Sequence, residues 1–127
     1  MVPIYQTVVL AEDSTDTRAM LKRALQFRGY HVLEAQNGLE ALEIAKLRRP
    51  ELFIVDLNMP KLDGLETVKR LRELESFEHV PVIAVTAFDV YGMEEAALES
   101  GFNTYLSKPI DLASKSFRIL CYAVLCY

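Results

Sequence analysis

Five side chains able to bind a cation or an anion stand at the ends of short, mostly apolar runs: Glu12, Asp13, Asp56, Thr86 and Lys108. The runs cover residues 8–11, 52–55, 82–85 and 105–107. Continuous Val, Ile and Leu runs are typical of buried parallel strands, and open α/β sheets bind ligands beyond the carboxyl ends of such strands. If these runs are neighbouring parallel strands, the five side chains meet at one edge of the sheet.

The chemistry of this set fits a divalent cation and a phosphoryl group. Three carboxylates that lie close together repel one another and require a cation, and a hard, oxygen-rich set suits Mg²⁺. The hydroxyl of Thr86 and the ammonium of Lys108 add donors for an anion, for which a phosphoryl group is the best candidate.

Length and composition predict one compact domain. The chain has 127 residues, of which 51% are hydrophobic and 25% charged, and it can bury a single core. A net charge of −4 disfavours a nucleic-acid surface, which needs clustered Lys and Arg. Neither a signal peptide nor a membrane-length apolar segment is recognised, and Cys121 and Cys126 fit neither a disulfide framework nor a metal site. We expect a cytoplasmic protein with no membrane partner.

Strand and helix signals alternate five times along the chain. A further short strand is expected at 31–35. Helical spacing is expected at 19–27, and further helices are expected at 37–46, 65–74, 89–100 and from 111 onward. Residues 14–16 offer N-cap chemistry for the first helix, and Asn37 and Asp89 are predicted caps of the second and fourth helices. Right-handed crossovers then predict an α/β fold: a single flavodoxin-like (βα)5 doubly wound parallel sheet with strand order 2-1-3-4-5.

In their order and spacing, these motifs resemble the response regulator receiver domain of bacterial two-component signalling, of the chemotaxis-regulator-like kind. The matching segments are residues 12–13, 55–60 with 63–64, 85–87 and 108–109. The resemblance covers essentially residues 5–120 of a domain assigned to 1–127. It implies that Asp56 accepts a phosphoryl group from a histidine kinase or a phosphotransfer protein. It also implies that Mg²⁺ is held by Glu12, Asp13, Asp56 and the backbone carbonyl of Asn58.

The same resemblance implies roles for residues around the phosphoacceptor. Lys108 would pair with one phosphoryl oxygen, and Thr86 would donate a hydrogen bond to another. Tyr105 matches the aromatic switch position, whose ring turns inward when the threonine moves, so that a downstream protein partner reads a conformational change. Asn58 and Phe88 would tune loss of the phosphoryl group. Because Phe88 stands where many members carry a polar side chain, slow autodephosphorylation is expected.

Other functional classes are weighed against this interpretation. A Mg²⁺-dependent phosphohydrolase on a similar sheet also uses a strand-end aspartate, but it would be expected to have a second aspartate where Asn58 stands and a cap insertion that is absent here. A non-phosphorylated binding module is disfavoured because the acidic set, Thr86 and Lys108 are all present. A stand-alone regulator and a receiver cut from a longer protein both remain open. In either case we expect a signalling phosphoacceptor, not an enzyme.

The C-terminal segment 119–127 contains no charged residue, although a final amphipathic helix should keep a polar face. Packing on a partner and an altered end of a longer chain are the two explanations. Exposed apolar patches commonly mark interfaces, and a symmetric pair is the default geometry. We therefore expect a homodimer formed through the last helix.

Overall fold

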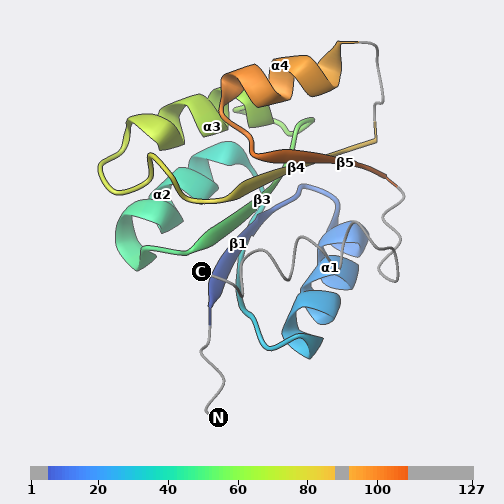
Figure 1. The fold of residues 1–127 in the computed structure, drawn as a ribbon. Coiled ribbons are helices and arrows are strands. Elements are labelled where there is room, and N and C mark those ends of the chain that lie inside the picture. The colour runs from blue at the N-terminus through green and yellow to red at the C-terminus, as the bar shows by residue number, and fades with distance from the viewer. Residues whose placement is uncertain (1–5, 88–91, 109–127) are drawn as a thin grey trace.

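The protein is a three-layer α/β domain, seen in a computed structural model that describes residues 6–87 and 92–108 (Figure 1). The strands are β1 (Thr7–Ala11), β2 (His31–Ala35), β3 (Leu52–Asp56), β4 (Val82–Thr86) and β5 (Thr104–Ser107). The helices are α1 (Thr15–Phe27), α2 (Gly38–Arg48), α3 (Gly64–Glu73) and α4 (Met93–Ser100). All strand pairs are parallel, and the order β2-β1-β3-β4-β5 confirms the predicted topology.

The register of the sheet brings the ends of its central strands level with one another. Ala11 of β1 lies beside Val55 of β3, and Asp56 lies beside Val85 of β4. Thr86, in turn, lies beside Ser107 of β5. The residues that follow these positions therefore emerge together at one side of the sheet, which we call the carboxyl edge.

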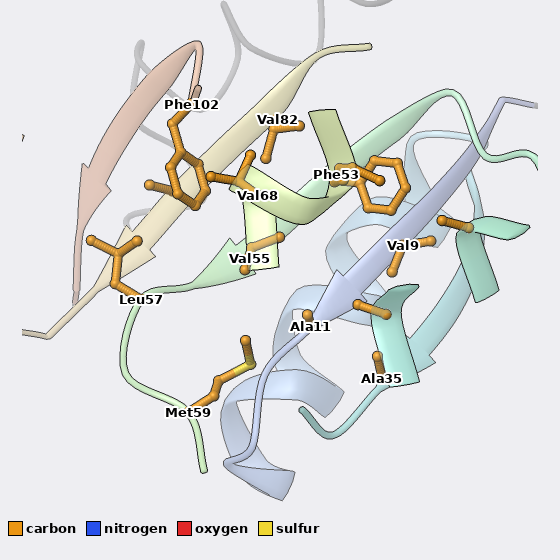
Figure 2. Close-up of a cluster of buried hydrophobic side chains, with 14 of the residues drawn as sticks. Val9, Ala11, Ala35, Phe53, Val55, Leu57, Met59, Val68, Val82 and Phe102 are labelled. Carbon is orange, nitrogen blue, oxygen red and sulfur yellow. The ribbon is translucent and has the colours of Figure 1, made fainter. Parts of the chain in front are cut away.

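Two apolar clusters cover the two faces of the sheet. Successive side chains of a strand point to opposite faces, and both faces here are buried, so β3 and β4 are apolar nearly throughout. One cluster, shown in Figure 2, joins Val9, Phe53 and Val82 to α2, α3 and α4. The rings of Phe53 and Phe77 meet edge to face there, with centroids 5.8 Å apart. The other cluster packs against α1.

Side-chain caps fix the first turns of α1, α2 and α3. The Ser14 hydroxyl accepts a hydrogen bond from a backbone N–H of α1 at 3.3 Å. The amide oxygen of Asn37 does the same for α2 at 2.9 Å, and the carboxylate of Asp63 for α3 at 2.8 Å. The predicted cap at Asn37 is confirmed, and Ser14 is the member of 14–16 that caps α1. The cap at Asp63 was not predicted from the sequence.

Helix α4 begins differently. Its N-cap is Gly92 in the left-handed conformation, with φ of 86° and no side-chain hydrogen bond. The prediction of Asp89 as the cap is therefore wrong, and Asp89 itself lies outside the described residues. Ala97 is the one buried residue of α4, so this helix is the least embedded of the four described.

Arg72, near the end of α3, links this helix to the segments that precede β4 and β5. Its guanidinium donates two hydrogen bonds to the carbonyl oxygen of Gly101, at 2.6 and 3.1 Å. Further bonds reach the carbonyls of Phe77 (3.0 Å) and Val80 (2.6 Å) and the amide oxygen of Asn103 (2.9 Å). Burial lowers the pKa of Arg72. This cluster, the Arg72 clamp, fixes the C-terminal end of α4 to α3.

Some expectations fall on residues that the structure does not describe. The last helix from 111, the apolar segment 119–127 and the dimer expected through them lie outside the described residues. No helix within 6–87 and 92–108 is long and apolar enough to cross a membrane.

Candidate functional site

Three carboxylates meet at the carboxyl edge of the sheet. Asp56 is the last residue of β3, while Glu12 and Asp13 directly follow β1. Each of the three offers an oxygen, and these oxygens all lie within 4.8 Å of one another. Glu12 and Asp56 are 2% and 4% exposed, whereas Asp13 is exposed. Hard carboxylate oxygens at such spacing fit a small divalent cation such as Mg²⁺.

Lys108 places its ammonium among these carboxylates. The Nζ atom lies 2.5 Å from Oε1 of Glu12 and 3.2 Å from Oδ2 of Asp56. Burial opposes the charge of this lysine, but the bonds to Glu12 and Asp56 outweigh burial and raise the pKa of Lys108. Three carboxylates and one ammonium leave a formal charge of −2, which one divalent cation balances.

Backbone groups orient the two buried carboxylates. The N–H of Asn58 donates to Oδ1 of Asp56 at 3.0 Å, and the N–H of Ser14 donates to Oε2 of Glu12 at 3.1 Å. Gly64 allows the start of α3 to approach β3 closely, because a Cβ there would lie only 2.6 Å from the carbonyl oxygen of Asp56. Asp56 is thus held by the N–H of Asn58 and by the close approach of Gly64.

Thr86 and Tyr105 lie on the same face of the sheet, on neighbouring strands. Ala84, two residues before Thr86, pairs with Tyr105, so the alternation of side chains directs both toward the layer of α4. Thr86 is buried, and its carbonyl oxygen accepts a hydrogen bond from the N–H of Lys108 at 2.7 Å. Tyr105 is half-buried against the cluster of Figure 2. Thr86 is thus bonded to the backbone of Lys108 and shares a face of the sheet with Tyr105.

The structure thus brings together Glu12, Asp13, Asp56 and Lys108, with Thr86 at the adjoining strand end. Phe88, predicted to tune phosphoryl loss, lies outside the described residues. Sequence reasoning did not find Arg18, whose guanidinium contacts the backbone of Glu12. A bond from a long side chain to a backbone carbonyl leaves no characteristic spacing in the sequence, so it could not be predicted. The cap chemistry of residues 14–16 was the one signal recognised at the start of α1.

Comparison with known proteins decides the family. The family model of the response regulator receiver domain matches residues 8–115. The chain belongs to this family. As a receiver domain of two-component response regulators it fits the resemblance drawn from its motifs, and the phosphohydrolase alternative is not favoured.

Individual relatives agree with this assignment. The receiver domain is 37% identical over 107 residues to the polar-differentiation response regulator DivK of Brucella anthropi, covering 84% of this chain and 87% of that one. A putative response regulator from Chloroflexus aurantiacus superposes with a TM-score of 0.88 at 28% identity, covering 98% of this chain and 100% of the other.

One structural relative bears on the acidic group. The receiver domain of the sensor histidine kinase PA1611 of Pseudomonas aeruginosa superposes with a TM-score of 0.87 at 28% identity, covering 98% of this receiver domain and 100% of the other chain. That structure has a magnesium ion coordinated in its active site cleft. Among the residues that the structure describes, the three carboxylates at the carboxyl edge form a group that could hold such an ion.

Proposed function

We propose that Asp56 is the phosphoacceptor of this receiver domain and that Mg²⁺ is held by Glu12, Asp13, Asp56 and the backbone carbonyl of Asn58. The observation that carries the proposal is the approach of three carboxylates and the Lys108 ammonium to a single point. Among these acids, Asp56 alone closes a central strand whose other residues are all apolar and buried. The backbone of Asp56 is therefore fixed by the sheet.

The contacts of Asp56 suggest how phosphoryl transfer proceeds. An oxygen of Asp56 attacks the phosphorus of a phosphohistidine on a histidine kinase or phosphotransfer protein, and the bond from phosphorus to the imidazole nitrogen breaks. The N–H of Asn58 fixes the direction of the carboxylate, and Lys108 is close enough to pair with an oxygen of the transferred group. When bound, Mg²⁺ offsets the charge of the carboxylates and of the phosphoryl oxygens.

Phosphorylation with acetyl phosphate tests this proposal. In the presence of Mg²⁺, intact-protein mass spectrometry should show one added phosphoryl group per chain, since one carboxylate is placed to accept it. Chelation of the metal with EDTA should prevent the addition, because the uncompensated acidic group repels the incoming anion. A sample that stays unmodified in Mg²⁺, or is modified equally in EDTA, contradicts the proposal.

A conformational signal to a downstream protein partner is the second part of the proposed function. The Thr86 hydroxyl would donate to a phosphoryl oxygen and draw the end of β4 toward Asp56. Tyr105 lies on the same face, one strand further, and packs against the cluster that includes Ala97 of α4, so a movement of its ring would alter the packing between β5 and α4. The surface of α4 and β5 would change as a result.

Amide chemical shifts measure this signal. Beryllofluoride with Mg²⁺ mimics the phosphorylated aspartate and should move the amide resonances of residues 92–108. Thr86→Ala should bind the mimic but show smaller changes there, because the hydroxyl that couples β4 to the phosphoryl group is missing. Wild-type resonances of 92–108 that do not move, in a sample whose site resonances do, would refute the coupling through Thr86.

A further inference from the structure

We propose that Arg18 is a positioning residue for the metal site, which holds residues 12–14, the acidic loop, in the conformation that binds Mg²⁺. The inference rests on the proposed function, because it concerns the same carboxylates. Arg18 lies near the start of α1, and within the described part of the chain its hydrogen bonds go to Glu12 and Glu34 and not to the phosphoacceptor. Its effect must therefore pass through the backbone of the acidic loop.

The first step is the contact between Arg18 and Glu12. Its Nη1 atom donates a hydrogen bond of 2.7 Å to the carbonyl oxygen of Glu12, and the Arg18 side chain is only 11% exposed. The N–H of Glu12 donates to the carbonyl oxygen of Ala35 on β2 at 3.0 Å. The peptide groups on both sides of Glu12 are thus fixed, one by β2 and the other by Arg18.

The second step is what this fixation does to the carboxylates. The two carboxylate oxygens of Glu12 are engaged by Lys108 and by the N–H of Ser14. With its backbone also held, Glu12 has little freedom left, and the direction in which the chain continues to Asp13 is set. Three like charges within 4.8 Å repel one another, so a loop without this tether would relax away from Asp56.

The third step is the anchor of Arg18 itself. Its Nε atom pairs with Oε1 of Glu34 on β2 at 3.1 Å, while Lys22 pairs with the other oxygen of Glu34 at 2.9 Å. The hydrogen bond from Lys22, with a further contribution from Arg18, lowers the pKa of Glu34 and keeps it ionised. Glu34 thereby holds the guanidinium plane in the orientation that points Nη1 at the acidic loop.

Lys22 supplies the matched control. It binds the same carboxylate as Arg18 and comes from the same helix, but its ammonium bonds to Glu34 and not to the acidic loop. Both members of that pair are about one-third exposed, and such ion pairs contribute little to stability. A change at Lys22 therefore removes a charge from the cluster without releasing the loop.

The inference is tested by measuring Mg²⁺ binding to the unphosphorylated chain with calorimetric titration. Arg18→Met should raise the dissociation constant of Mg²⁺ by about ten-fold, which is the size of effect seen when a group that orients a metal ligand is lost. Lys22→Met should bind close to the wild type. Arg18→Lys should restore little, because one ammonium cannot reach the carbonyl and Glu34 in the fork geometry of a guanidinium. Urea unfolding in EDTA shows separately whether each variant is folded.

The outcomes separate the two proposals. If wild type fails to bind Mg²⁺, the proposed function is wrong, whatever Arg18 does. If wild type binds and Arg18→Met binds equally well, the positioning role is wrong. Should Arg18→Met not fold, Glu34→Gln takes its place: it leaves Arg18 intact but loosens its anchor, and it should weaken Mg²⁺ binding in the same direction. Unchanged binding in Glu34→Gln and in Arg18→Lys would then overturn the inference.

Discussion

Asp56→Asn is expected to abolish phosphorylation by acetyl phosphate and to leave the domain folded. The amide has nearly the shape of the carboxylate, and its oxygen can still accept the hydrogen bond that the N–H of Asn58 donates at 3.0 Å. An amide oxygen is a far weaker nucleophile, however, and one of the three metal-binding charges is lost. Intact-protein mass spectrometry in Mg²⁺ measures the result, which should be no detectable adduct.

Asp63→Asn is the matched control for that experiment. Asp63 is also an aspartate near the start of α3, but its carboxylate caps the helix, and asparagine caps equally well. This variant should therefore be phosphorylated like the wild type. A stoichiometric adduct on Asp56→Asn, with the wild-type and Asp63→Asn samples behaving alike, would move the phosphoacceptor to another residue.

Arg72→Met is expected to lower the free energy of unfolding by about 3 kcal/mol, because several buried carbonyl oxygens lose a charged donor at once. Methionine keeps most of the apolar stem of Arg72, so lost packing contributes little. The carbonyls of Phe77, Val80 and Gly101 are left without the donor that now serves them. Urea unfolding at neutral pH gives the free energy difference.

The control for Arg72 lies one half-turn away on the same helix. Arg70 pairs with Glu66 at 3.3 Å, and both side chains are close to half-exposed. Arg70→Met should cost less than about 0.5 kcal/mol, as exposed pairs one turn apart in a helix do. Equal effects at the two positions would mean that the Arg72 clamp adds no more stability than an exposed ion pair.

Much of the fold could be predicted because the signals were local. The fully apolar runs of β3 and β4 end in Asp56 and Thr86, and the parallel order then places these ends side by side. The caps at Ser14 and Asn37 also depend on a few neighbouring residues, which a reader of the sequence sees directly. The same reasoning assembled the acidic group from three separate positions.

The contacts that escaped prediction join distant segments through the backbone. Arg18 and Arg72 each bind backbone carbonyl oxygens. Because every residue has such an oxygen, the sequence does not indicate which residue is the partner. Gly92 was missed for a different reason. Asp89 is a good cap by residue type, but α4 begins after a glycine in the left-handed conformation. That conformation depends on the course of the backbone and not on a capping side chain.

The two ends of α4 are held unequally, so a displacement of one end would tilt the helix about the other. Its far end is fixed to α3 by the bonds from Arg72 to Gly101, whereas its near end, beside the carboxyl edge, begins at Gly92 without a side-chain cap. Eight helical residues form an arm of about 12 Å. If phosphorylation moves the end of β4 as proposed, the near end of α4 is the end free to follow it, and the helix would tilt about Gly101. A partner bound along α4 would then detect a change in the angle of the helix.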